Sequence, residues 1–583
     1  MLTKPLPDSV KSMVLKHFPF PTARAYQLEA AWACQVAKWQ GKKFAVAELP
    51  TGIGKSPLGM CVGQLLTSNL RDTYNDRMAA ANLPPNKEVV FGSTILTRTR
   101  SLQQQYESTE GAAVLWGKSH YSDVDEDNPP DKVHTCGKGC PGMTYEHKFF
   151  ECPYVLAKKE FFNEDNVGIA NNALFLSSWQ VQNYPKILVV DECHTFVNAL
   201  IDYCEIYVNT RRIYNIMKAH QISHIEFIEQ CIEYESGLDD GRLMLRKIEK
   251  YLINLRDFVK YTVIPPVEEA IASLEKYASD NPRTRKKVKK MEKDLKFLCT
   301  FNENMTRAVE SRYAKGSWVL WKESEERLNY ETNLKETVSK IYMKPMDPLP
   351  EVVENIIGDK EFTLFMSATV GDYVEFCEGM GLDPEDGVDM RAPAIFDPEN
   401  RPVYPLDVAS MNYSNREELL AEDGSYTSMV CSIMNQHKGQ RGVIHSVSYA
   451  NAELLRKNVP LDIMKRLYVV PRGTIVNESY IKTLPQDAVI VSPSIAEGVD
   501  LRDDLARFQI ILKIPFGSLG DHWIKAKLNR SESWYSNAAA IEVAQMIGRV
   551  CRTPEDFGAT YILDSNFNRI KGLLASYIRD AIK

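Results

Sequence analysis

The apolar positions of the chain form short uninterrupted runs, which are followed by turns and then by further apolar stretches. The first clear run is FAVAEL at 44–49, and PLGMCVGQLL at 57–66 follows it after a glycine-rich turn. A second run, ILVV at 187–190, ends directly at two carboxylates. Apolar runs of this length are typical of buried strands, and the strand–turn–helix order is typical of parallel sheets. The pattern therefore predicts an α/β fold.

A different pattern fills residues 200–355. The stretches at 211–234 and 240–263 place apolar residues three or four apart, which predicts helices. The run RTRKKVKKMEKDLK at 283–296 is basic; a solvated helix face is our first interpretation, and contact with nucleic acid is the alternative. Trp318 and Trp321 could stack on bases, but we expect core packing. The last stretch, 565–583, predicts one amphipathic helix.

Composition and charge narrow the class of protein. The 583 residues are 44% hydrophobic and 25% charged, as in ordinary soluble proteins, and the length allows several domains. The net charge of -7 argues against binding nucleic acid through bulk charge, so any such path must be a local basic groove. No apolar run has the length of a membrane span, and the N-terminus lacks the apolar region of a secretory signal. We expect a cytoplasmic protein of a bacterial or phage-infected cell, acting as a monomer without a membrane partner.

The turn between the first strand and its helix has the chemistry of a phosphate-binding loop. Glycines let backbone N–H groups approach phosphate oxygens, Lys55 would reach the β- and γ-phosphates, and Ser56 would bind Mg²⁺. The usual first glycine of the general pattern is replaced by Leu49. A glycine-rich turn without nucleotide is the alternative. The predicted contacts to ATP and Mg²⁺ in this turn are Thr51, Gly52, Gly54, Lys55 and Ser56.

The carboxylates that end the second strand are candidates for catalysis. Ligands of a parallel sheet collect at the carboxyl ends of its strands, where Asp191 and Glu192 lie. Asp191 is suited to hold Mg²⁺, directly or through water, and Glu192 to polarise the attacking water. Capping of the following helix is the alternative reading.

An arginine-bearing helix is predicted far downstream, in AIEVAQMIGRVCRTPEDFG. Gln545, Arg549 and Arg552 recur at helical spacing near one face. Arginines that stabilise charge on a transferring phosphoryl group are often supplied across a domain interface. Taken alone, such a helix would be a solvated face. Beside a phosphate loop and a carboxylate pair it completes a set of catalytic residues.

These motifs occur in the order found in superfamily 2 helicases, and the chain most resembles their iron–sulfur branch, the DinG and XPD group. The resemblance covers nearly the whole chain. The motifs that carry it are ELPTGIGKS (48–56), DECH (191–194), MSAT (366–369), SIAEGVDL (494–501) and QMIGRVCR (545–552). Supporting segments are RAYQ (24–27), STILTRTRSLQQQY (93–106) and GVIHSVSYANAELL (442–455).

The resemblance implies two RecA-like motor domains that enclose ATP. Arg24 and Gln27 would contact the nucleotide, with Gln27 reading adenine. Gly498 and Asp500 would approach the nucleotide from the second domain. Ser367 and Thr369 would couple hydrolysis to nucleic-acid contact. The residues expected to touch the nucleic acid are Thr97, Arg98, Arg100 and Ser446.

The same resemblance implies two insertions in the first motor domain. One is a small cysteine-bearing cluster domain, and the other is a helical, arch-like domain. The expected boundaries are 1–107 for the first part of motor domain 1, 108–165 for the cluster insertion, 166–199 for the DECH strand, 200–355 for the arch, 356–396 for the return to motor domain 1 and 397–583 for motor domain 2.

Three clustered cysteines raise the question of a metal. Cys136, Cys140 and Cys152 match the family's cluster ligands, while Asp123 stands where the first cysteine is expected. A [4Fe–4S] cluster with Asp123 as the fourth ligand is our first hypothesis. A zinc site completed by one of the nearby histidines, His120, His134 or His147, is the second. Unliganded thiols are the third.

The combined prediction is an ATP-dependent DNA helicase that moves on single-stranded DNA and unwinds forked duplexes. The resemblance implies 5′→3′ movement. The alternative is a nucleic-acid-stimulated ATPase that remodels protein–nucleic acid complexes or RNA without processive unwinding. Stimulation of ATP hydrolysis by single-stranded DNA is the observation that would favour a helicase.

Overall fold

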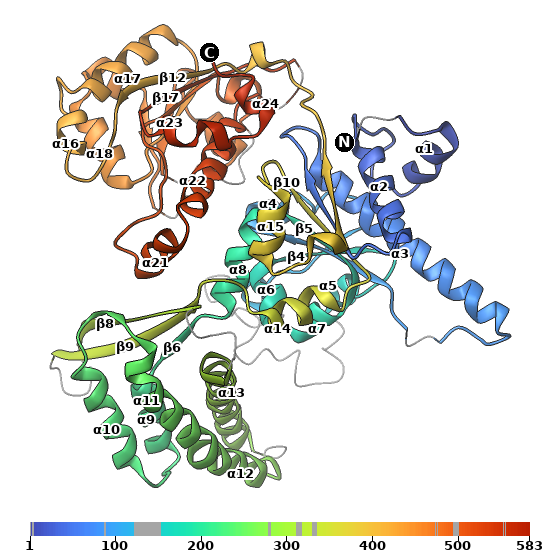
Figure 1. Ribbon diagram of the computed structural model, residues 1–583, viewed down its shortest axis with the longest axis vertical. Coiled ribbons are helices and arrows are strands. Elements are labelled where there is room, and N and C mark those ends of the chain that lie inside the picture. Colours follow the sequence, from blue (N-terminus) through green and yellow to red (C-terminus); the bar gives the residue numbers. More distant parts are fainter. Residues whose placement is uncertain are drawn as a thin grey trace. The chain divides into compact units, whose positions relative to one another are not determined.

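The computed structural model describes the chain except for residues 1, 3–4, 87–88, 122–152, 278–280, 311–316, 329–334, 473, 475, 494–500, 552 and 554 (Figure 1). The described residues form two compact units. The first comprises Met1–Ala199, Pro350–Gly517 and Ser533–Lys583. The second comprises Leu200–Leu349 and Ser518–Glu532.

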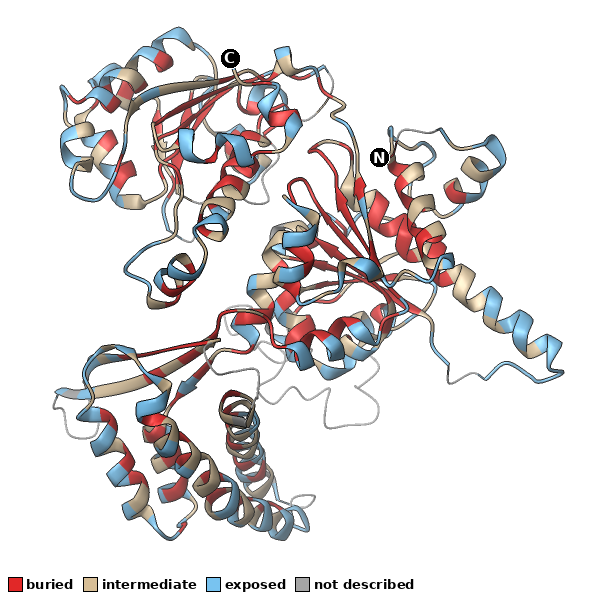
Figure 2. Cartoon of the chain, in the orientation of Figure 1, coloured by how far each residue is buried: buried red, intermediate tan, exposed pale blue. Residues whose placement is uncertain are grey.

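The first unit contains a seven-stranded parallel sheet, in the order β11-β1-β10-β5-β2-β4-β3. Residues of β1, β2 and β10 are buried throughout, as the apolar runs predict for strands covered on both faces. In Figure 2 these strands are red, while much of the helix surface around them is pale blue or tan. The strands are β1 (Phe44–Glu48), β2 (Gly92–Thr97), β3 (Ala112–Val114), β4 (Val167–Asn171), β5 (Pro185–Asp191), β10 (Phe362–Ser367) and β11 (Gly387–Arg391).

Helices on both sides of the first sheet carry its core. Ala30 and Cys34 of α2 and Leu58 and Met60 of α3 belong to the same buried cluster as Val189 of the sheet. The helices around this sheet are α1 (Asp8–Leu15), α2 (Gln27–Trp39), α3 (Lys55–Ala80), α4 (Arg100–Gln104), α5 (Pro153–Phe161), α6 (Asn172–Ser177), α7 (Trp179–Asn183), α8 (Phe196–Tyr203), α14 (Pro350–Val353) and α15 (Tyr373–Met380).

A second parallel sheet of six strands follows in the order β12-β17-β16-β13-β15-β14. Its strands are β12 (Val403–Ala409), β13 (Gly442–His445), β14 (Leu467–Val469), β15 (Val489–Ser492), β16 (Phe508–Ile511) and β17 (Ala559–Asp564). Its helices are α16 (Arg416–Leu419), α17 (Ser425–Gln436), α18 (Tyr449–Asn458), α19 (Leu461–Met464), α20 (Glu478–Thr483), α22 (Glu532–Ile547), α23 (Phe567–Ile570) and α24 (Ser576–Arg579). Two parallel sheets with helices confirm the α/β fold expected from the sequence.

The second unit combines helices with an antiparallel sheet, in the order β6-β9-β8-β7. The helical spacing at 211–263 was interpreted correctly, but the sheet was not predicted. Its strands are β6 (Ile206–Val208), β7 (Gly241–Leu243), β8 (Trp318–Leu328) and β9 (Lys335–Pro345). The helices are α9 (Thr210–Ala219), α10 (Ile225–Ser236), α11 (Leu245–Phe258), α12 (Ile264–Glu275), α13 (Pro282–Glu310) and α21 (His522–Arg530).

Local packing explains the strands of this second unit. Ile341 and Met343 alternate with less buried neighbours on β9, which is the two-residue period of a half-buried strand. Trp318 and Trp321 lie in the core as expected, and Trp321 stacks on Tyr342 across the strand pair with ring centroids 5.2 Å apart. Cross-strand aromatic pairs of this kind stabilise antiparallel sheets.

A short segment from much later in the sequence, Ser518–Glu532, completes the second unit. Trp523 of α21 donates its indole N–H to the carbonyl of Pro345 at 2.8 Å. Lys527 of the same helix donates to the carbonyl of Met346 at 2.9 Å and lies 3.3 Å from a carboxylate oxygen of Asp347. The two hydrogen bonds run from side chains to backbone carbonyls, so apolar periodicity gives little sign of them.

The predicted helix at 565–583 is wrong as a single element. It is divided into α23, a 3₁₀ turn at Lys571–Leu573, and α24. Leu574 and Ala575 between them have extended backbone, with ψ of 149° and 147°. The apolar side chains of both pieces, including Phe567 and Tyr577, pack into one core cluster, and tertiary packing here overrides helical continuity.

Candidate nucleotide-binding and hydrolysis site

The carboxyl ends of three neighbouring strands bring the predicted catalytic motifs together. Strand β10 lies between β1 and β5, so that Glu48 is in register with Ser367, and Met366 with Asp191. The phosphate-loop turn follows β1, the DECH carboxylates end β5, and the SAT segment (367–369) ends β10. Parallel strands thus place motifs that are far apart in sequence at one sheet edge.

The loop after β1 has the backbone shape that its glycines allow. Gly52 and Gly54 have φ of 85° and 88°, values that residues with a Cβ rarely adopt. A Cβ on Gly54 would also lie 2.5 Å from the side-chain nitrogen of Gln27. Lys55 and Ser56 follow at the start of the 26-residue helix α3, whose N-terminus is a favourable place for phosphate.

Arg24 and Gln27 hold this loop from the side. The Gln27 amide donates to the carbonyl of Gly54 at 2.8 Å and accepts from the backbone N–H of Arg24 at 2.6 Å. Arg24 donates its guanidinium to the carbonyl of Gly52 at 2.6 Å. Gln27 is 2% exposed. The structure therefore brings both residues to the predicted nucleotide loop, bonded to its carbonyl groups.

The DECH carboxylates differ in their electrostatics. Burial and the neighbouring charge of Glu192 raise the pKa of Asp191 to about 7, against the opposing effect of Lys55. Burial would also raise the pKa of Glu192, but Lys55, His194 and Arg549 outweigh it and lower that pKa to about 2. Lys55 lies 3.5 Å from Glu192. Glu192 therefore stays ionised at neutral pH, whereas Asp191 is fully ionised only with a cation beside it.

A row of hydrogen bonds leads from Glu192 to α22. This helix ends at Ile547, so Gln545 lies on it as predicted, but Arg549 follows it in a turn, and the prediction that Arg549 lies on the same helix is wrong. The Ser367 hydroxyl donates to Glu192 Oε2 at 3.2 Å, and His194 Nδ1 lies 2.9 Å from Ser367 Oγ. On the other side of the ring, His194 Nε2 lies 2.7 Å from Nε2 of Gln545. We call these four residues, Glu192, Ser367, His194 and Gln545, the relay.

The donors in the relay can be assigned. Burial lowers the pKa of His194 to about 4, so its ring is neutral at neutral pH. Since the Ser367 proton goes to Glu192, His194 Nδ1–H donates to Ser367 Oγ, and Nε2 accepts from the Gln545 amide. Every donor in the relay therefore points toward Glu192.

The second sheet positions the other side of the site. Gln509 of β16 donates its amide N–H to the carbonyl of Ile547 at 3.2 Å, at the end of α22, and its Oε1 accepts from His445 Nε2–H at 3.0 Å. Gly548 follows, and a Cβ there would meet Thr51 Cγ2 at 2.8 Å, so glycine permits this close approach to the phosphate loop. Arg549 comes next, and its charge contributes to the lowered pKa of Glu192.

Glu48 was not predicted as a functional residue, yet it fixes the loop after the SAT segment. Its carboxylate accepts from the backbone N–H groups of Val370 at 2.9 Å and Gly371 at 3.2 Å. Arg391 forms an ion pair with it at 3.1 Å and donates to the carbonyl of Gly371 at 2.7 Å. Thr369, just before this loop, is 3% exposed.

The predicted nucleic-acid residues differ in exposure. Thr97 and Ser446 are buried at the ends of β2 and β13, Arg98 is half-buried, and Arg100 is exposed at the start of α4. Arg98 lies close enough to the relay for its charge to contribute to the lowered pKa of His194. Their contact with nucleic acid stays a prediction.

Two further residues of the site, besides Glu48, were missed although they lie within motifs quoted from the sequence. His194 is the last residue of DECH, and Tyr106 ends the 93–106 segment. Tyr106 is 1% exposed, and burial with the charges of Asp191 and Glu192 raises its pKa well above the ordinary value. The apolar and polar pattern gave no sign of either contact, because both depend on how separate strands are placed.

The comparisons with known proteins agree with the motifs. The helicase C-terminal domain family matches residues 448–581. The "ATP-dependent DNA helicase YoaA" of Haemophilus influenzae is 20% identical, over 93% of this chain and 91% of its own length. Among solved structures, S. tokodaii Xpd4 has the same fold, with a TM-score of 0.55, 13% identity, and coverage of 96% of this chain and 99% of that one.

The chain therefore contains a helicase C-terminal domain and is similar along most of its length to a DNA helicase. A shorter similarity is to a "Regulator of telomere elongation helicase 1 homolog" of Culex quinquefasciatus, which is 30% identical over 20% of this chain and 14% of its own length. No helix in the described part of the chain is long and apolar enough to cross a membrane.

Several predicted site residues lie outside the described residues. They are Gly498, Asp500 and Arg552 of the motor, and Asp123, Cys136, Cys140 and Cys152 of the cysteine-bearing segment. Within the described residues, no group of three or more His, Cys, Asp or Glu could hold a metal ion. Tyr121 and Tyr154, on either side of that segment, have ring centroids 5.5 Å apart, so the chain leaves and returns at one place.

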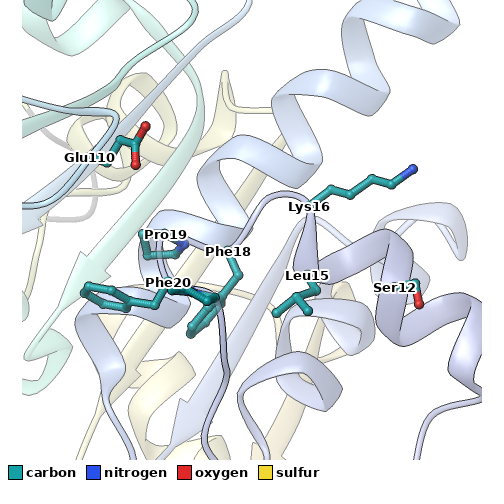
Figure 3. Close-up of a pocket in the computed structure, with 8 residues that line it drawn as sticks. Ser12, Leu15, Lys16, Phe18, Pro19, Phe20 and Glu110 are labelled. Carbon is teal, nitrogen blue, oxygen red and sulfur yellow. The ribbon is translucent and has the colours of Figure 1, made fainter.

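A hollow in the first unit is lined by residues other than those of the hydrolysis site. It has a volume of about 490 Å³ and is lined mainly by the end of α1 and the segment that follows it, with Phe18, Pro19 and Phe20 gathered in Figure 3. Glu110 is its one lining residue from a distant part of the sequence. The hollow contains none of the residues predicted for catalysis.

Proposed function

We propose that this chain hydrolyses ATP in the presence of Mg²⁺ and uses the resulting domain movement to travel along single-stranded DNA and separate duplexes. The expected direction is 5′→3′, from the resemblance to the DinG and XPD group. The Haemophilus influenzae relative is named as an ATP-dependent DNA helicase, and it is similar along nearly the whole chain.

The observation that carries the proposal is the relay. A water-polarising carboxylate, Glu192, is connected through Ser367 and His194 to Gln545, which belongs to a distant sequence motif and lies on α22. A metabolic phosphate-loop enzyme needs Lys55 and Asp191 but has no need of a bonded path to a distant helix. A motor needs such a path, because hydrolysis must change the placement of a second domain.

The roles of the individual residues follow from their positions. Lys55 would hold the terminal phosphates, Ser56 and Asp191 would hold Mg²⁺, and Glu192 would orient the attacking water. Bound Mg²⁺ would neutralise phosphate charge and orient the terminal phosphate. With Mg²⁺ beside it, Asp191 would ionise despite its raised pKa. Arg549 and Arg552 would stabilise charge that develops on the phosphate, while Gly498 and Asp500 would approach the nucleotide from the second domain.

Arg24 and Gln27 would couple the binding of adenine to the conformation of the phosphate loop. Both side chains bond to loop carbonyls. An adenine that accepted a hydrogen bond from the second N–H of the Gln27 amide would therefore also affect the bond from Gln27 to Gly54. The adenine role of Gln27 remains part of the proposal. Arg100 is the exposed cation of the predicted nucleic-acid set, and Thr97, Arg98 and Ser446 would be reached at the ends of their strands.

A [4Fe–4S] cluster held by Cys136, Cys140, Cys152 and Asp123 is the cofactor we propose for the segment between Tyr121 and Tyr154. The support is the cysteine spacing and the meeting of the two tyrosines that flank it. Zinc with a histidine ligand, or no metal, are the other outcomes that a metal analysis would distinguish.

The deciding experiment measures ATP hydrolysis with and without single-stranded DNA, followed by strand separation on duplexes with one 5′ or one 3′ tail. We expect strong stimulation by single-stranded DNA and unwinding of the 5′-tailed substrate. The Lys55→Ala variant should lose at least about 100-fold in hydrolysis rate, since it removes a phosphate contact of the transition state. Hydrolysis that single strands do not stimulate would contradict the proposal. Stimulation without unwinding would indicate the remodelling ATPase instead.

A further inference from the structure

The longest helix of the second unit, α13, has one apolar and one cationic face. Val288, Met291, Leu298 and Phe301 are buried. Seven cations are exposed along the rest of the same stretch, namely Arg283, Lys286, Lys287, Lys289, Lys290, Lys293 and Lys296. We call this set the α13 basic face.

The cations follow the geometry of the helix. Arg283, Lys286, Lys290 and Lys293 are spaced by three, four and three residues, so they form a single stripe along a helix of 3.6 residues per turn. From Arg283 to Lys296 the face extends about 20 Å at 1.5 Å per residue. The stripe reaches Phe297, where the guanidinium of Arg212 from α9 lies 3.8 Å from the ring centroid. Arg212 is exposed and prolongs the charge.

Negative charge is nearly absent from this face. Only Glu292 and Asp294 are acidic in the stretch 283–296, and a carboxylate oxygen of Asp294 lies 3.3 Å from Nε2 of His220, the residue after α9. Within the part of the chain that the structure describes, none of the seven cations makes an ion pair. A solvated helix surface usually alternates both signs. Here cations repeatedly lie three or four residues apart, as Lys286 does from Lys289 and Lys290, which destabilises a helix unless an anion neutralises them.

The face suits a duplex more than a single strand. Proteins that bind single strands add aromatic side chains on which bases stack. On the described part of α13 no aromatic side chain is exposed; Phe297 is covered by Arg212. A row of mobile ammonium groups is instead suited to a regular, dense array of phosphates, and a DNA duplex carries one negative charge per about 1.7 Å of its axis.

We propose that the α13 basic face binds the phosphate backbone of double-stranded DNA. The inference rests on the proposed function, since it assumes that the chain works on DNA. It adds a DNA-binding surface in the second unit, formed by residues that take no part in the hydrolysis site. Binding there would be independent of base sequence and steeply dependent on salt.

The test uses the full chain and a blunt DNA duplex without tails, whose affinity is measured over a range of salt concentrations. The variant is Lys286→Gln/Lys290→Gln/Lys293→Gln, which removes three charges of the stripe and keeps a good helix former at each position. The matched control is Arg246→Gln/Lys247→Gln/Lys250→Gln, which removes three exposed charges from α11 in the same unit.

We expect the α13 variant to bind the duplex at least about tenfold more weakly near 0.1 M salt, with the slope of log affinity against log salt smaller by about two to three. The control should stay near the unaltered chain in affinity and slope. ATP hydrolysis stimulated by single-stranded DNA should be unchanged in both variants, which also shows that they fold.

Three results would overturn the inference: unchanged duplex binding by the α13 variant, equal losses in variant and control, or a loss of single-strand affinity as large as the loss for duplex. In each of these cases the unaltered chain still responds to single-stranded DNA, so the proposed function stands. A chain that responds to no DNA at all would instead contradict the proposed function, and the inference with it.

Discussion

The hydroxyl of Tyr577 donates a hydrogen bond to the carbonyl oxygen of Ala368 at 3.2 Å, which joins α24 to the SAT segment. Tyr577 is 7% exposed. Arg401, in the connection between the two parallel sheets, donates to the Tyr577 carbonyl at 3.0 Å and lies 5.3 Å from its ring centroid. Val403 bonds to the carbonyl of Ala581 at 2.8 Å. The end of the sequence is thus tied both to the SAT segment and to the connection between the sheets.

The Tyr577→Phe variant tests whether this tie serves coupling. It removes only the hydroxyl, so the free energy of unfolding should fall by about 1 kcal/mol. Because Ala368 lies between Ser367 and Thr369, we expect a several-fold rise in the single-stranded DNA concentration that gives half-maximal stimulation of hydrolysis, while unstimulated hydrolysis changes little. Tyr426→Phe is the control, since the Tyr426 hydroxyl donates to the carbonyl of Ala409, remote from the SAT segment. Equal effects of both variants on stimulation would show that the tie is structural only.

The relay predicts that Ser367 and Gln545 act together. Ser367→Ala removes the bond to ionised Glu192, and hydrogen bonds to charged groups contribute about 1.5–3 kcal/mol. We therefore expect DNA-stimulated hydrolysis to fall about 10- to 100-fold. Gln545→Ala should give a loss of the same kind.

The double variant is the sharper measurement. If the relay is one connected path, Ser367→Ala/Gln545→Ala should lose little more than the worse single variant, because the path is already broken. Losses that multiply would mean that the two residues act independently, and the relay would then have no part in coupling.

Sequence reasoning was strongest where chemistry is local. The glycines at 52 and 54, the lysine after them and the carboxylates after ILVV are adjacent in the chain, and the structure brings these motifs to one sheet edge. It was weakest where function or packing depends on distant partners. His194 gains its role from Ser367 and Gln545, and Glu48 from Arg391 and the backbone of Val370, so neither is marked by its own neighbours in sequence.

The second unit shows the same limit for the fold. The helices at 211–263 follow from spacing, but β8 was not predicted because it ends in a charged stretch, KESEERL, whose polar residues resemble a helix surface. The partner of β8 is only recognisable once the alternation of Ile341 and Met343 is set against Leu320 and Lys322 across the pair. The contacts of Trp523 and Lys527 are to carbonyl groups, which every residue carries, and no residue type announces them.

The cysteine-bearing segment gives a prediction about metal content. Protein purified without oxygen should be brown, with about four iron and four sulfide per chain, if three cysteines and Asp123 hold a cluster. Asp123→Cys should then retain the iron and lose it more slowly in air, because a thiolate replaces an oxygen ligand. Cys152→Ser, which removes a ligand, should lose it faster. A colourless protein that contains one zinc ion per chain would contradict the iron–sulfur hypothesis.

A buried carboxyl in the second unit predicts a pH dependence of local stability. Glu235 is 1% exposed, and it accepts hydrogen bonds from Thr210 at 2.6 Å and from Tyr251 at 2.5 Å. Burial raises its pKa from 4.5 to about 7, against the effects of these bonds and of Lys322. Between these two pH values the unfolded state releases the proton while the folded state keeps it. The free energy of unfolding should therefore fall by up to about 3 kcal/mol as pH rises from about 4.5 to about 7.

Hydrogen exchange of the backbone amides in α10 and α11, measured at pH 5 and pH 7.5 and corrected for intrinsic exchange, checks this dependence. Protection should be lower at pH 7.5 in the unaltered chain. Glu235→Gln cannot ionise, so it should show nearly equal protection at both values, and Glu233→Gln, at an exposed position on the same helix, should behave like the unaltered chain. Cys231 and Tyr251 also face Glu235, but burial raises the pKa of the thiol and of the phenol far above this pH range. A pH dependence that survives Glu235→Gln would therefore contradict the prediction.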